Sequence, residues 1–225
     1  MVHNGEAIVK RIISYSLWGS NPLYLNGARR VIRTRPEFYP EWTIRVYVDG
    51  SVPAEFVAEL EAGGCEVVRK PDAPAGMGLY WRFEAMYDDP DIERFMVRDF
   101  DSPFLAREVA AVNEWIQLDV DFHIMRDNRV HETPILGGMW GAKAGCIRDF
   151  KQMLSLWWQG FTPHSTDPRS PFYGSDQEFL GRYVWPVIQG RFVAHDEYFT
   201  DGRFGPVRPF PIPRTAAGEY VGMVA

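Results

Sequence analysis

The sequence predicts an α/β protein with a mostly parallel sheet that helices flank, followed by an irregular tail. Segments of strand and helix character alternate through the first 70 residues. Connections of that length between strands are right-handed crossovers, which make the strands parallel. After residue 200 the chain carries Pro206, Pro209, Pro211 and Pro213, a density typical of an irregular segment wrapped on a surface.

The elements of the first half follow from hydrophobic periodicity and turn residues. Alternating segments indicate strands, and apolar residues at helical spacing indicate the helices between them. Pro36 is expected to end the first helix, and the Gly63-Gly64 pair the second. In order, we expect a strand at Arg11–Trp18, a helix at Leu23–Arg35, a strand at Thr43–Val48, a helix opened by Pro53, and a strand at Cys65–Val68.

The second half reads in the same way and contains a glycine-rich stretch from Pro134 to Gly145. Ser175 to Glu178 has the form of a capping box, which predicts a helix start. In order, we expect a helix at Tyr80–Tyr87, a buried strand at Asp91–Val97, a helix at Ala106–Leu118, a strand at Asp121–Met125, a helix marked by Ile147, Phe150, Leu154 and Trp157, a helix at Phe179–Trp185, and a strand at Phe192–Ala194.

Composition excludes several classes of protein. With 46% hydrophobic and 24% charged residues, the chain is not disordered. Its net charge of −6 argues against duplex nucleic acid or an anionic membrane as partner, although one divalent cation could still recruit a phosphate-bearing ligand. Cys65 and Cys146 lack metal-type spacing, so neither a disulfide scaffold nor a structural zinc site is expected. With no apolar leader and no apolar run long enough for a transmembrane segment, we expect a soluble, cytoplasmic protein.

The acidic residues are unevenly distributed. From Glu84 to Asp121 there are eleven acidic and three basic residues, and the remainder of the chain is slightly basic. Of the three Asp-x-Asp pairs, only Asp99/Asp101 follows a convincing strand. Ligands bind outside the carboxyl ends of parallel strands, and two carboxylates there can hold a divalent cation that leaves positions for a diphosphate. Turn-capping aspartates remain the alternative.

The chain resembles the GT-A class of nucleotide-sugar glycosyltransferases over about residues 10–200. The order and spacing of seven segments carry the resemblance: ISYSLWG (13–19), VYVDG (46–50), YWRFEAM (80–86), FMVRDFDS (95–102), GGMWGAKAG (137–145), YGSDQEFL (173–180) and AHDEYF (194–199). The resemblance implies a single GT-A-like, Rossmann-like domain over 1–200, with a nucleotide-binding half at about 10–102, an acceptor and sugar half at about 103–200, and a tail at 201–225.

The resemblance also implies roles for individual residues. Asp99 and Asp101 would bind the metal, Mn²⁺ or Mg²⁺, and the donor, and His195 would be a further metal or phosphate ligand. Asp176 would be a catalytic or acceptor-binding carboxylate. The remaining donor contacts would come from Ser16, Trp18, Gly19 and Asp49 at the nucleoside, Arg82 near the base or phosphate, and Gly138 and Trp140 at the sugar.

Trp140 also has an argument that does not depend on the resemblance, and Lys143 is a further candidate. Trp140 stands near glycines, which let a backbone approach a ligand, and an indole face stacks on a sugar ring. Lys143 is a candidate to add positive charge at the donor, with an ordinary surface role as the alternative.

The function we expect is metal-dependent transfer of a hexosyl or deoxyhexosyl group, from a UDP- or GDP-type sugar donor to a glycan, lipid-linked or other hydroxyl acceptor, as in polysaccharide biosynthesis. Nucleic acid is not an expected partner. A sugar-phosphate nucleotidyltransferase is the first alternative, although the glycine-rich loop with arginine is absent after the first strand. A non-catalytic carbohydrate-binding module on the same fold is the second.

Overall fold

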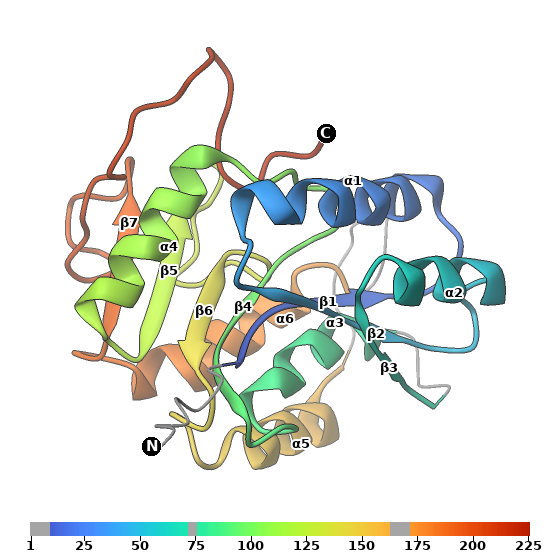
Figure 1. Ribbon diagram of the computed structural model, residues 1–225. Coiled ribbons are helices and arrows are strands. Elements are labelled where there is room, and N and C mark those ends of the chain that lie inside the picture. The colour runs from blue at the N-terminus through green and yellow to red at the C-terminus, as the bar shows by residue number, and fades with distance from the viewer. Residues whose placement is uncertain (1–9, 72–75, 163–171) are drawn as a thin grey trace, which may run out of the picture.

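A seven-stranded sheet forms the centre of the computed structural model, which describes residues 10–71, 76–162 and 172–225. Its strands are β1 (Lys10–Leu17), β2 (Thr43–Val48), β3 (Glu66–Arg69), β4 (Ile92–Val97), β5 (Phe122–Arg126), β6 (Trp140–Lys143) and β7 (Phe192–Asp196). The strand order is β3-β2-β1-β4-β6-β5-β7, and only β6 runs antiparallel to its neighbours (Figure 1). The predicted mostly parallel sheet is confirmed.

Helices cover both faces of this sheet (Figure 1). One face packs against α1 (Pro22–Phe38), α2 (Ala54–Ala62) and α4 (Ala106–Leu118), through buried side chains such as Val31, Leu60 and Val112. The other face packs against α3 (Gly78–Trp81), a 3₁₀ turn η1 (Arg82–Met86), α5 (Phe150–Gly160) and α6 (Ser175–Phe179). After α6 come the π-helical turn η2 (Leu180–Val184) and the 3₁₀ turn η3 (Trp185–Val187). None of the helices in the described part of the chain has the length and hydropathy to cross a bilayer.

Three local expectations are corrected. The first helix does not end at Pro36 but runs to Phe38. A proline near the end of a helix removes only one hydrogen bond, and here the last turn still closes, because the Tyr39 N–H donates to Arg35 O at 2.8 Å. The capping box is wrong. Gly174 precedes α6 at φ 78°, and the Ser175 hydroxyl instead accepts from Tyr80 Oη at 2.9 Å.

The third correction is β6, which lies inside the glycine-rich stretch where no strand was expected. Glycine is depleted in strands, so the local pattern does not indicate one. Gly141 explains the exception, because a Cβ there would lie 2.9 Å from Phe95 O and 3.1 Å from the Trp115 ring. Only a residue without a side chain lets β6 pair beside β4 at this point.

The tail after β7 is irregular, as predicted, and returns to the edge of the sheet near α1 (Figure 1). Phe210 and Val221 are buried against the sheet end. The last residue, Ala225, donates its backbone N–H to Asp101 O at 2.9 Å, and its carbonyl accepts from Arg30 Nη1 at 2.8 Å. The tail therefore contacts the loop that follows β4.

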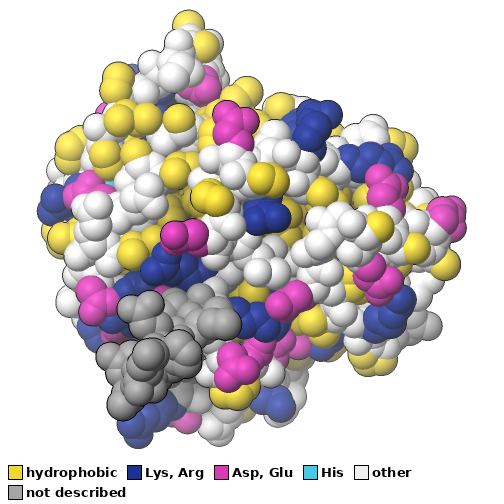
Figure 2. Space-filling model, viewed as in Figure 1, with side chains coloured by type: hydrophobic (Ala, Val, Ile, Leu, Met, Phe, Trp, Pro, Cys, Tyr) yellow, Lys and Arg dark blue, Asp and Glu magenta, His cyan; other side chains and the backbone are white. Residues whose placement is uncertain are grey.

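The surface shows no gathering of one charge on the face in Figure 2. Basic and acidic side chains lie beside one another among the described residues of that face, with apolar groups between them. Such a face lacks the basic stripe that phosphate-backbone recognition uses.

Candidate functional site

The candidate site lies at the carboxyl ends of the central parallel strands. Because β1, β2 and β4 are parallel, their carboxyl ends meet at one edge of the sheet. Ser16 lies at the end of β1, Asp49 directly follows β2, and Asp99 follows β4 after one residue. The Asp-x-Asp pair that the sequence singles out thus lies at the edge where open α/β sheets bind ligands.

The loop carrying Asp99 and Asp101 is held in place from several sides. The Phe100 ring stacks on Tyr15 of β1 with centroids 4.1 Å apart and planes 5° apart. Gly27 of α1 lies so close that a Cβ there would be 1.8 Å from Phe100 O. Arg30 donates to Asp101 O at 3.0 Å. These contacts fix the loop before any ligand arrives, which is the arrangement that a binding site requires.

Arg98 anchors the start of the same loop from inside the protein. Its Nε donates to Glu108 Oε1 of α4 at 2.6 Å, and its Nη1 donates to Trp140 O at 3.1 Å. Tyr39 donates its hydroxyl to the same Glu108 oxygen at 3.1 Å. The buried Arg98–Glu108 pair therefore ties the Asp-x-Asp loop to α4 and β6, a link for which sequence reasoning had no signal beyond two charged residues ten positions apart.

Arg82 joins Asp99 to Asp176, and the two carboxylates come from distant parts of the sequence. Its Nη1 donates to Asp99 Oδ1 and to Arg98 O, the latter at 3.2 Å, and its Nη2 donates to Asp176 Oδ2 at 2.9 Å. The side chains of Arg82 and Asp176 are each 7% exposed, whereas that of Asp99 is 43% exposed. The cluster therefore has a buried inner part and a carboxylate that faces solvent.

Burial and neighbouring charges change the pKa of two acids in this cluster, Asp176 and Asp101. Burial raises the pKa of Asp176; Arg82 opposes the rise and Asp99 adds to it. Burial raises the pKa of Asp101 as well, and the Asp99 charge adds to the effect. Both carboxyls would gain from a bound cation, since a nearby positive charge favours the ionised form.

Two consecutive glycines pack against these carboxylates. A Cβ on Gly138 would lie 1.9 Å from Asp99 Oδ2, and one on Gly137 would lie 2.1 Å from Asp176 Oδ2. The segment before β6 can therefore approach the acids only as bare backbone. The resemblance placed the segment that contains both glycines at the donor sugar, but it gave no reason to expect that they contact these two carboxylates.

Substituting Gly138 with alanine is expected to displace Asp99 and, for the nucleotide-sugar donor that the sequence predicts, to lower the affinity at least tenfold. The new methyl would overlap a carboxylate oxygen that is itself held by Arg82, so Asp99 must rotate. Gly160→Ala is the matched control, since a Cβ there meets nothing within 4 Å. Calorimetric titration with the donor measures both; equal affinities for the two variants would contradict the close approach.

The other residues expected at the nucleoside lie around the ends of β1 and β2. The Ser16 hydroxyl accepts from Arg82 N at 2.9 Å, so it supports the start of η1. Gly19, at φ 67°, donates its N–H to Ser51 Oγ at 2.7 Å, and Asp49 accepts from the same serine. Trp18 is 43% exposed, so part of its surface remains open to a ligand.

Three expected side chains do not reach this cluster. Trp140 lies in β6 with no exposed surface, its ring stacked on Phe122 at 5.1 Å and 2°. Lys143 is at the opposite end of the sheet, because the antiparallel β6 pairs it with Arg94 near the start of β4. It pairs there with Asp119 Oδ1 at 3.0 Å.

His195 lies in β7, three strand spacings or about 14 Å from β4. Its Nδ1 is 2.8 Å from Nε2 of His123, and its Nε2 is 3.3 Å from Glu114. Burial lowers its pKa. Among the residues that the structure describes, no three His, Cys, Asp or Glu side chains are grouped as a metal site.

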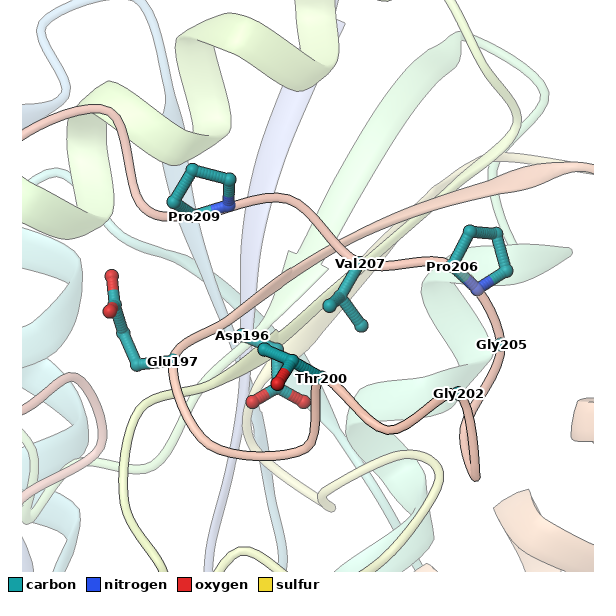
Figure 3. A pocket seen from close by; sticks show the side chains of 8 residues that line it. All are labelled: Asp196, Glu197, Thr200, Gly202, Gly205, Pro206, Val207 and Pro209. Carbon is teal, nitrogen blue, oxygen red and sulfur yellow. The ribbon is translucent and has the colours of Figure 1, made fainter.

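A separate hollow of about 610 Å³ opens at the carboxyl end of β7 (Figure 3). Figure 3 shows two acidic side chains at this hollow, Asp196 and Glu197. Asp196 is already held by Arg126 at 2.5 Å and by two backbone N–H groups. The lining residues are Asp196, Glu197, Thr200, Gly202, Gly205, Pro206, Val207 and Pro209. The hollow shares no residue with the cluster around Arg82.

Neither a protein-family model nor a curated protein matches the sequence. Solved structures do match the architecture. The galactosyltransferase LgtC, in complex with donor and acceptor sugar analogues, is 15% identical, with a TM-score of 0.54 over 82% of this chain and 73% of that one. The chain has a GT-A-like fold.

Two further structures share this GT-A-like architecture. Mannosyltransferase PcManGT from Pyrobaculum calidifontis, in complex with GDP-Man and Mn²⁺, is 14% identical with a TM-score of 0.50, and the match covers 90% of this chain and 57% of that one. The 4-diphosphocytidyl-2C-methyl-D-erythritol synthase from Anaerococcus prevotii is 12% identical with a TM-score of 0.50, over 85% and 90% of the chains. At these identities the likeness is one of fold.

Proposed function

We propose that this protein is a metal-dependent glycosyltransferase that moves a sugar from a nucleotide-diphosphate donor to a hydroxyl acceptor. The observation that carries the proposal is the pair Asp99 and Asp101, pre-positioned at the carboxyl end of β4 in a GT-A-like sheet. LgtC and the mannosyltransferase, which share that sheet, bind a donor sugar analogue and GDP-Man with Mn²⁺, respectively.

The donor set fits a hard divalent cation. Mg²⁺ and Mn²⁺ prefer oxygen ligands and commonly bind one or two carboxylates together with water and phosphate oxygens. Asp99 and Asp101 supply two carboxylates, one of them well exposed. A bound cation would neutralise charge that develops on the departing diphosphate.

The protein's own residues have complementary roles in this proposal. Asp99 and Asp101 hold the cation, and Trp18, Asp49 and the backbone after β1 face the nucleoside. Because Asp176 is nearly inaccessible and 2.9 Å from Arg82, its proposed role is to hold the guanidinium beside Asp99. The N-terminal half would then bind the donor, and residues 103–200 the acceptor. Transfer of a hexosyl or deoxyhexosyl group, a role in polysaccharide biosynthesis and a cytoplasmic location stay predictions.

A panel of UDP- and GDP-sugars tests the proposal. The purified chain is expected to release nucleoside diphosphate from at least one donor by slow hydrolysis, and chelation of Mn²⁺ or Mg²⁺ should abolish the release. Absence of both nucleotide binding and hydrolysis across the panel would contradict it and would favour a carbohydrate-binding module.

A nucleotidyltransferase is the second candidate, because the diphosphocytidyl-methylerythritol synthase matches 85% of this chain. It would join a nucleoside triphosphate to a sugar phosphate and release pyrophosphate. Pyrophosphate release without donor hydrolysis would therefore decide for this alternative.

A further inference from the structure

One positive side chain already sits where the proposed function places a divalent cation. The Arg82 guanidinium contacts Asp99, the first acid of the Asp-x-Asp pair, through Nη1. The side-chain carboxylate of Asp101 accepts a 3.4 Å hydrogen bond from the neighbouring Ser102 hydroxyl and forms no ion pair with a basic side chain among the described residues. A cation entering from solvent would thus meet Asp99, which is exposed but shared with an arginine, and the half-buried Asp101, which has no such partner among the described residues.

Arg82 can release Asp99 without losing all of its partners. Its Nη1 also donates to Arg98 O at 3.2 Å, and its Nη2 keeps Asp176 at 2.9 Å. A buried guanidinium without partners would be costly, but here two acceptors remain when Asp99 turns toward a metal. The Ser16 hydroxyl further holds the Arg82 backbone, so the side chain need not leave the cluster.

We propose that Arg82 competes with the divalent cation for Asp99 and thereby weakens metal binding to the free enzyme. The inference rests on the metal site of the proposed function. Two positive charges on one carboxylate repel each other, so the fixed charge of Arg82 lowers the affinity of the Asp99/Asp101 pair for Mn²⁺. Asp176 is the second acceptor that keeps Arg82 in the cluster when the metal takes Asp99.

The test is a titration of the full chain with Mn²⁺ alone at pH 8, with free Mn²⁺ followed by electron paramagnetic resonance. Arg82→Gln is expected to bind Mn²⁺ at least tenfold more tightly than the wild type, and Asp101→Asn in that background should abolish the gain. Arg82→Lys, which keeps the charge, should stay within threefold of the wild type.

Arg94→Gln is the matched control, since Arg94 is equally buried but pairs with Asp119 at the other end of β4. It should lower thermal stability and leave Mn²⁺ affinity unchanged. If Arg82→Gln binds Mn²⁺ no more tightly than the wild type, or if neither binds it, the proposal is overturned.

A crystal structure of the wild type soaked in Mn²⁺ gives an independent answer if Arg82→Gln does not fold. Arg82 Nη1 should have left Asp99 while Nη2 still contacts Asp176, and an unbroken Arg82–Asp99 contact beside a bound ion would overturn the proposal. These readouts use metal alone. A failure of the proposed function would appear instead as absent donor turnover by the wild type.

Discussion

Replacing Asp101 with asparagine is expected to lower metal-dependent hydrolysis of the nucleotide-sugar donor at least a hundredfold. Asparagine has nearly the same shape, so the loop held by Arg30 and the Phe100–Tyr15 stack should keep its position. What is lost is one of the two negative ligands of the proposed cation, and a group that stabilises developing charge, as this cation would, is commonly worth 10²–10³-fold in rate. Initial rates of nucleoside diphosphate release at saturating Mn²⁺ measure the effect.

Asp91→Asn is the matched control for this substitution. Asp91 is the second acid of another Asp-x-Asp pair, but it is exposed and lies at the opposite end of β4, before the strand begins. Its replacement should leave the rate within twofold of the wild type. Equal losses in the two variants would show that overall acidity, rather than a site at the end of β4, supports the reaction.

Replacing Asp127 with alanine is expected to lower the free energy of unfolding by about 3–5 kcal/mol, the usual cost of breaking a buried ion pair from one side. The Asp127 side chain has no exposed surface and fastens the tail to the domain. It accepts from Arg107 Nε at 2.9 Å, from Arg214 Nη2 at 2.9 Å and from Val221 N at 3.0 Å. Without it, Arg107 and Arg214 lose a shared carboxylate, and the Val221 N–H is left buried without its acceptor.

Urea unfolding measures this loss, and limited proteolysis should show earlier cleavage after residue 200. Asp127→Asn should cost less, because an amide oxygen can still accept from Val221. The exposed pair of Asp201 with Arg203 supplies the control, and Asp201→Ala should leave the unfolding midpoint unchanged. An unfolding free energy of Asp127→Ala within 1 kcal/mol of the wild type would show that the tail is held mainly by its apolar contacts.

The first half of the fold could be predicted almost completely from the sequence, because its signals are local. Thr43–Val48 alternates, and Gly63 and Gly64 end α2, so these boundaries follow from a few neighbouring residues, whereas the end of α1 lies beyond the expected stop at Pro36. The second half contains β6, whose central Gly141 is needed for the close approach of Phe95 and Trp115. No local pattern could reveal a strand whose reason is a contact with residues far away in the chain.

The residues of the candidate site also fall into those that local sequence features indicate and those that only the tertiary structure brings together. By itself the sequence determined that two acids, Asp99 and Asp101, follow a buried strand and that a Gly-Gly pair comes later, because strand ends and glycines are local features. Only the tertiary structure decided that Arg82 reaches Asp99 and Asp176, 17 and 94 positions away.

The tertiary structure also decided where three expected site residues lie. The Trp140 side chain packs into the core, the antiparallel direction of β6 carries Lys143 to the far end of the sheet, and the place of β7 at the edge of the sheet separates His195 from the acids. The physical reason is common to all three. Strand order and direction are set by how the whole sheet packs between its two layers of helices, and the sequence of one strand does not indicate which strands lie beside it.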